Sequence, residues 1–85
     1  MKATFEAIEG DPALSPLLDK IPDQPGFSAA QKTRLQTSLR LLREKKGTVD
    51  DYARIMLQLG RVVRLNLSKD PSLNERLQTI LKVNQ

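Results

Sequence analysis

Few side chains in this sequence are equipped for chemistry, because it contains no His and no Cys. Without thiolates and imidazoles, the chain can form no disulfide, zinc-thiolate site, imidazole metal site or Ser-His-Asp triad. Asp50 and Asp51 are adjacent carboxylates, but neighbours on a helix point about 100° apart and make no working acid/base pair. Their position suits the first turn of a helix, where carboxylates oppose the helix dipole.

The glycines and acidic residues also lack the spacing of a cofactor or metal site. Gly10, Gly26, Gly47 and Gly60 lie too far apart for a phosphate-binding loop. No series of oxygen ligands has the spacing of an EF-hand. We therefore predict a protein that is not an enzyme, with no catalytic, cofactor or metal site and no small-molecule substrate.

Basic side chains remain, and they are unevenly spread along a chain of net charge +4. Residues 1–27 hold five acidic residues and two lysines, whereas residues 28–85 hold twelve basic and five acidic residues. The densest basic stretch, 28–46, contains six Lys and Arg residues and a single acidic residue, Glu44. Three interpretations stay open: a solvated helix face partly neutralised by the acidic segment, a surface for an acidic protein, or a surface for nucleic-acid phosphates.

A protein interface is indicated by two leucines that fall outside the expected apolar stripes. Leu41 and Leu65 each lie beside basic residues in helical projection, and arginines with large apolar side chains suit interface centres. Single exposed leucines are also common without any function. We predict a small regulatory or adaptor protein that binds an acidic protein, or a second copy of itself as a homodimer, without a membrane. The predicted contact residues are Lys32, Arg40, Leu41, Arg43, Arg54 and Arg61.

The alternative is a nucleic-acid-binding regulator that uses the same basic residues on phosphates. The only aromatic residues, Phe5, Phe27 and Tyr52, lie outside the basic stretch, which disfavours base stacking. A basic helix followed by a Gly turn and a second helix invites comparison with a helix-turn-helix. However, the second helix is mostly apolar and offers few side chains to a major groove.

The basic stretch is expected to form a helix over residues 28–46. Ser28 and Gln31 have the spacing of a capping box, in which each side chain bonds the other residue's backbone N–H. The helix should stop at Gly47, a common residue just past a helix end. Its lysines in the last turn suit the negative end of the helix dipole.

Two further helices are expected over residues 48–67 and 71–83. Thr48 and Asp70 are their predicted N-caps, with Pro71 as the first helical residue of the last one. Helix 48–67 is apolar around most of its circumference, so it should lie at the centre and contact neighbours on several sides. We expect Gly60 to allow close approach of another helix. The apolar face should comprise Val49, Tyr52, Ala53, Met56, Gly60, Val63 and Leu67, and Ile55, Leu59 and Val62 should extend it sideways.

The pattern predicts an all-α fold, a small bundle of three main helices with a short helical N-terminal arm. Short helices are expected over 2–9 and 12–20. We predict a single domain over residues 1–85. Its parts are an acidic arm (1–22), a Pro- and Gly-containing connector (22–27) and a core bundle (28–85). The first two long helices should be antiparallel or steeply crossed. We hypothesise that the arm docks on the basic face as a removable cover.

The sequence also predicts a compartment. No apolar run follows the first residues, so we expect no secretory signal. No stretch approaches the length of uninterrupted apolar residues that a membrane span needs. The complete lack of Cys fits a cytoplasmic protein.

Overall fold

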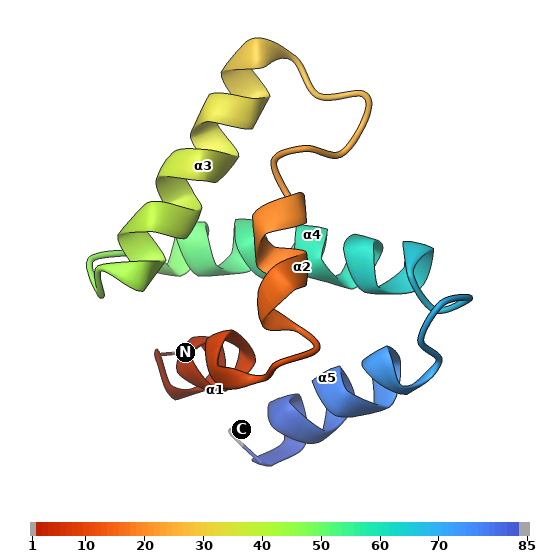
Figure 1. Ribbon diagram of the computed structural model, residues 1–85. Helices are drawn as coiled ribbons and strands as arrows, with labels where there is room; N and C mark the ends of the chain where they lie inside the picture. The colour runs from red at the N-terminus through yellow and green to blue at the C-terminus, as the bar shows by residue number, and fades with distance from the viewer. Residues whose placement is uncertain (1, 84–85) are drawn as a thin grey trace.

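Five helices follow one another in the computed structural model, which describes residues 2–83 and has no strand among them. Figure 1 shows their arrangement. The all-α fold with three main helices and a short helical N-terminal segment is therefore confirmed; residues 1, 84 and 85 lie outside the described part. The helices are α1 (Lys2–Gly10), α2 (Ser15–Lys20), α3 (Ala29–Arg43), α4 (Val49–Leu65) and α5 (Ser72–Val83).

Side-chain caps begin the two longest helices. At the start of α3, the Ser28 Oγ accepts from the Gln31 N–H at 3.2 Å, and the Gln31 Oε1 accepts from the Ser28 N–H at 2.8 Å. At the start of α4, Thr48 and Asp51 exchange the same two bonds at 3.2 and 2.9 Å. The capping residues expected at Ser28 and Thr48 are thus confirmed, and each satisfies backbone donors that a helix start leaves unpaired.

The end of α3 lies earlier than expected, at Arg43 instead of Lys46. Lys45 adopts a left-handed backbone conformation with φ 63°. Its N–H donates to the Leu42 carbonyl at 3.1 Å, and the Lys46 N–H donates to the Leu41 carbonyl at 2.8 Å. These bonds form a Schellman motif, a helix end that usually places Gly where this chain has a lysine.

The two glycines singled out in the sequence have other roles than those expected. A Cβ atom added to Gly47 would lie 2.5 Å from the Cδ2 of Leu42, so the loop between α3 and α4 passes too close to α3 for a side chain. A Cβ atom added to Gly60 would meet nothing within 4 Å. The predicted close approach of a helix at Gly60 is therefore wrong.

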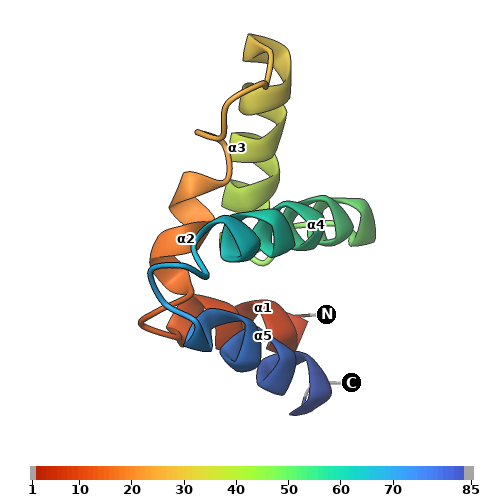
Figure 2. The ribbon, with the colours of Figure 1, turned by 90° about the vertical axis from the view of Figure 1, so that its right-hand side faces the viewer.

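Helix α4 is the centre of the fold, as predicted, because it packs against α3, α2 and α5. Helices α3 and α4 cross steeply (Figure 1), which confirms the expected tight joint between them. Helices α1 and α5 pack side by side on the far side of α4 from α3 (Figure 2). The fold therefore places the basic helix α3 at one end of the molecule, with one side turned to α4.

The core draws on the N-terminal segment as well as on the long helices. Among the described residues, six of fifteen buried hydrophobic side chains come from the segment that the sequence sets apart as an arm. They are Phe5, Ile8, Leu14, Leu17, Leu18 and Ile21. Helices α1 and α2 are thus built into the same core as α4 and α5, which argues against a removable cover.

The buried face of α4 is rotated from the one expected. Ile55 and Leu59 are fully buried, whereas Val49 is 70% exposed and Ala53 is exposed. Apolar residues occupy so much of the circumference of α4 that periodicity alone places the centre of its buried face poorly. The neighbouring helices select the Ile55 side, and Val49 and Leu57 stay in solvent.

Candidate functional site

The predicted contact residues of α3 do not share one surface. Lys32 and Arg43 lie on the flank that faces the N-terminal segment. The Lys32 Nζ pairs with the Asp23 carboxylate at 3.2 Å. The Arg43 guanidinium pairs with the Asp19 carboxylate at 3.0 Å and donates a second hydrogen bond to Glu9. This flank of α3 is therefore neutralised within the chain.

The remaining acidic residues of the N-terminal segment have basic partners as well. Glu6 lies 3.7 Å from the Lys45 Nζ, just beyond the end of α3. Asp11 accepts from the Arg76 guanidinium of α5 at 2.9 Å. Four of the five acidic residues before residue 28 thus face α3 or its C-terminal cap. The uneven charge along the chain is largely an internal complementarity between α3 and the segment packed beside it.

Arg43 is held most firmly of these cations. Burial disfavours its charged form, but hydrogen bonds and attraction from Glu9 and Asp19 outweigh burial and raise the pKa of Arg43. A guanidinium held between two carboxylates has little capacity left for a partner. Arg43 therefore joins α3 to α1 and α2.

The outward side of α3 and the adjoining face of α4 carry cations that no acidic residue of α1, α2 or the connector pairs among residues 2–83. Arg34 and Leu41 are seven residues apart on α3, and Arg54 and Arg61 are seven apart on α4, so each pair shares a helix face. Arg34, Arg40 and Arg61 are exposed and have no ion pair within residues 2–83. We call this surface the open face. It comprises Arg34, Arg40, Leu41, Arg54, Arg61 and Leu65.

The leucines of the open face differ in exposure. Leu65 is 70% exposed, as its place outside the apolar stripe predicts, whereas Leu41 is half-buried. Val49 and Leu57 add exposed apolar surface on the next face of α4. The open face thus combines free guanidinium groups with apolar side chains at its edge.

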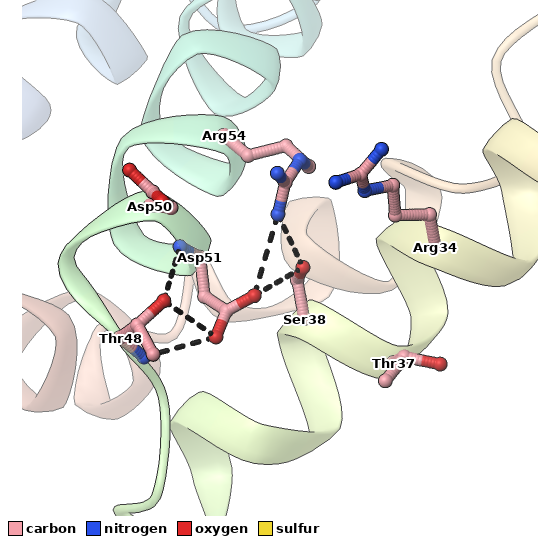
Figure 3. A pocket seen from close by; sticks show the side chains of 7 residues that line it. All are labelled: Arg34, Thr37, Ser38, Thr48, Asp50, Asp51 and Arg54. Atoms are coloured by element: carbon pink, nitrogen blue, oxygen red, sulfur yellow. Dashed lines mark hydrogen bonds and ion pairs between the residues drawn. The ribbon is translucent and has the colours of Figure 1, made fainter.

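A polar cluster joins α3 to α4 at the centre of this face (Figure 3). The buried Ser38 hydroxyl donates to the Asp51 carboxylate at 2.7 Å and accepts from the Arg54 guanidinium at 3.0 Å. Arg54 also donates to Asp51 at 3.3 Å, while Thr48 donates to the other Asp51 oxygen from its backbone and hydroxyl. We call Ser38, Thr48, Asp51 and Arg54 the polar clamp.

The polar clamp keeps its carboxylate ionised. The hydrogen bond from the Thr48 backbone lowers the pKa of Asp51, followed by the bond from the Ser38 hydroxyl, and Arg54 adds to the effect. The ionised Asp51 in turn fixes the guanidinium of Arg54 at one end. Arg54, predicted as a contact residue, is thus partly a structural residue with its remaining N–H groups toward the open face.

Two hollows open beside the polar clamp, and Arg34 and Arg54 line both. The polar hollow, of about 400 Å³, is lined by Arg34, Thr37, Ser38, Thr48, Asp50, Asp51 and Arg54. The amide hollow, of about 220 Å³, is lined by Phe27, Gln31, Arg34, Leu35, Arg54 and Gln58. The polar hollow has equal numbers of arginines and aspartates, whereas the amide hollow has two arginines and no carboxylate.

The arrangement is suited to binding rather than to acid/base catalysis. Asp50 points away from the polar clamp (Figure 3), and the Asp51 oxygens are all occupied by donors. Within residues 2–83, no group of three or more His, Cys, Asp and Glu residues could hold a metal ion. No helix in this part of the chain is long and apolar enough to cross a membrane.

Several residues of this site were not among those predicted. Ser38 interrupts the apolar stripe of Leu35, Leu39 and Leu42, and a polar residue in such a stripe is a signal that it has a buried partner. Arg34 and Leu41 are seven residues apart and share a helix face. This spacing could have identified Arg34 as a member of the site. For Phe27, Gln31 and Gln58 no sequence signal points to a shared hollow, because they come from different elements.

Comparison of the chain with protein-family models, with curated proteins and with solved structures finds no match. The geometry of the described residues therefore carries the functional argument alone.

Proposed function

We propose that this protein is a small, non-enzymatic regulatory or adaptor protein that acts in the cytoplasm by binding an acidic protein through its open face. One observation carries the proposal. The basic residues on the inner flank of α3 are paired with acidic residues of α1, α2 and the connector, whereas Arg34, Arg40 and Arg61 face outward without such partners among the described residues.

The chemistry of the open face supports a protein partner. Arginine is well suited to planar carboxylates, since its guanidinium can donate two parallel hydrogen bonds to them. The exposed Leu65 beside these arginines gives the face apolar area, which interface centres commonly combine with arginine. A second copy of the chain is the alternative protein partner.

Nucleic acid is the second candidate, and the aromatic side chains weigh against it. Phe5 is buried, while Phe27 and Tyr52 pack against the core. Base stacking is therefore limited to the half-buried rings of Phe27 and Tyr52, which lie on different elements. The outer face of α4 carries Val49, Ala53 and Leu57, which are not side chains that recognise bases in a major groove.

The test is an affinity capture from a lysate of the source organism, with and without nuclease. The test variant, Arg40→Glu with Arg61→Glu, reverses two charges of the open face. The control variant, Lys69→Glu with Lys82→Glu, makes the same change of net charge elsewhere on the surface. We expect a protein that survives nuclease treatment, is lost with the test variant and is retained with the control.

Three results would contradict the proposal. A partner lost equally with both variants would indicate only a net-charge effect. A partner lost with nuclease would favour nucleic acid, and purified duplex DNA should then bind with log K falling by about 0.9 per phosphate contact per unit of log salt concentration. A partner retained with the test variant would place the interface elsewhere. Sedimentation of the purified protein distinguishes a homodimer from a different partner.

A further inference from the structure

The amide hollow presents hydrogen-bond donors and few acceptors. The Oε1 of Gln31 is occupied by the backbone N–H at the start of α3, at 2.8 Å. The Oε1 of Gln58 accepts from the side-chain amide of Gln24 at 3.2 Å. The group left free on each of these glutamines is therefore the NH₂ donor. With Arg34 and Arg54, every polar side chain that lines this hollow has donors to offer.

The charges of the amide hollow also favour an anion. Arg34 has no ion-pair partner within the described residues, and only one terminal nitrogen of Arg54 is engaged by the polar clamp. Figure 3 shows the two guanidinium groups turned toward each other, with no carboxylate between them. Two like charges in this arrangement repel, and an anion placed between them would replace repulsion by two sets of charge-assisted hydrogen bonds.

The other part of the hollow is apolar. Phe27 and Leu35 line it beside the two arginines, and Phe27 is half-buried. The volume of about 220 Å³ lies below the range of about 300–1,000 Å³ that is typical of small-molecule and cofactor pockets. This size and lining suit one carboxylate and one adjacent apolar side chain.

We infer that the amide hollow binds an Asp or Glu side chain of the partner, bridged by Arg34 and Arg54, together with a neighbouring large apolar residue that contacts Phe27. The inference rests on the proposed function and names the chemistry that the open face recognises. A nucleic-acid phosphate fits less well, because Asp50 and Asp51 line the adjoining polar hollow and would repel the next phosphate along a strand.

The inference is tested with a minimal probe, the acetylated and amidated dipeptide Glu-Leu. It is titrated into the ¹⁵N-labelled protein, and amide shifts in the two-dimensional NMR spectrum report the binding site and affinity. The matched dipeptide Gln-Leu lacks the charge, and inorganic phosphate lacks the apolar part. We expect Glu-Leu to shift residues around the amide hollow and to bind at least about tenfold more tightly than either control.

Two variants separate the hollow from the rest of the surface. Arg34→Gln removes one guanidinium at an exposed position. Gln31→Glu keeps the capping box, since Glu serves there as well as Gln, but places a carboxylate beside the arginines that competes with the probe. We expect either change to weaken Glu-Leu binding about tenfold or more while Lys82→Gln leaves it unchanged. Far-UV circular dichroism checks that each variant remains helical.

Each contrary result has a definite meaning. Equal binding of Glu-Leu and Gln-Leu, shifts elsewhere on the protein, or no shift up to about 10 mM would overturn the inference. Phosphate that binds as tightly as Glu-Leu would refute the role of the apolar side chain and favour a nucleic-acid partner. A captured protein partner without dipeptide binding would leave the proposed function standing and refute only the hollow. Dipeptide binding without any captured protein would refute only the adaptor role.

Discussion

Substitution of Asp51 by Ala should destabilise the protein by about 2–4 kcal/mol, although Asp51 lies near the surface. Loss of the capping box at the start of α4 costs about 1 kcal/mol. The buried Ser38 hydroxyl also loses its acceptor, and an unsatisfied buried donor costs about 1–3 kcal/mol. A domain of this length has a total stability of about 4–13 kcal/mol, so the loss is a substantial part of it.

The assay is urea unfolding followed by far-UV circular dichroism, with Asp50→Ala as the matched control. Asp50 is the adjacent, exposed carboxylate in the same helical turn and has no hydrogen bond to the polar clamp. Its loss should change the free energy of unfolding by less than about 1 kcal/mol, the size of a single carboxylate's interaction with the helix dipole. Equal effects of the two substitutions would refute the role assigned to the polar clamp.

A double-mutant cycle sharpens the test. In the wild-type background, Ser38→Ala removes a satisfied hydroxyl and should destabilise the protein. In the Asp51→Ala background, the Ser38 hydroxyl has lost its acceptor and keeps only the bond from Arg54, so the same change should destabilise the protein less. The Ser38→Ala effect should therefore be smaller in the Asp51→Ala background than in the wild type. Additive effects would contradict the contact between Ser38 and Asp51 that joins α3 to α4.

Three further predictions concern the backbone and acid stability, each measured from unfolding curves. Gly60→Ala should stabilise the protein by about 1 kcal/mol because the added methyl group meets no described neighbour. Gly47→Ala should destabilise it because the added methyl group clashes with Leu42. Stabilisation by both substitutions would contradict the close contact at Gly47. Lys45→Gly should stabilise the protein by up to about 1 kcal/mol, because glycine adopts the left-handed conformation freely. A loss of stability would mean that the exposed ion pair between Lys45 and Glu6 contributes more than the backbone strain costs. The pKa of Asp51 is lowered in the folded protein, so its stabilisation is complete above the unfolded value near 4 and is lost as pH falls through the lower folded value. The stability gap between the wild type and Asp51→Asn should therefore narrow as pH falls below about 4, and a gap that widens would refute the direction of the shift.

The helices could be predicted from the sequence because their signals are local. Ser28 with Gln31, and Thr48 with the carboxylates after it, fix helix starts through bonds across three residues. The end of α3 could not be placed as well. Lysine seldom takes the left-handed conformation, so nothing in the sequence indicated that Lys45, two residues before Gly47, would adopt it.

The arrangement of side chains around α4 depends on distant contacts, and there the sequence was a weaker guide. Apolar residues surround much of α4, so its buried side was set by which helices pack against it and not by its own pattern. The expected role of Gly60 is wrong for the same reason, since no described residue from another element lies within reach of a methyl group there. The sequence predicted that α4 is central but not which face each neighbour covers.

For the candidate site, the sequence shows the number of basic residues but not which of them have acidic partners in the fold. The excess of basic residues after residue 27 is a property of the sequence, and it directs attention to α3 and α4. Which cations are neutralised depends on where the fold places α1, α2 and the connector, whose acidic residues pair with Lys32 and Arg43. Arg34 stays outside that network and has no acidic partner among the described residues.

The internal ion pairs neutralise some cations of α3 and leave others unpaired among the described residues. Exposed ion pairs contribute little to stability, typically less than about 1 kcal/mol each, so the acidic segment is not held in place by charge. It is held by its own buried side chains, such as Ile8, Leu14 and Leu18, which belong to the core. Because the hydrophobic core fixes the acidic residues on one flank of α3, the exposed guanidinium groups of Arg34 and Arg40 stay unpaired among the described residues. The burial of α1 and α2 therefore determines which side of the basic helix is available to an acidic partner.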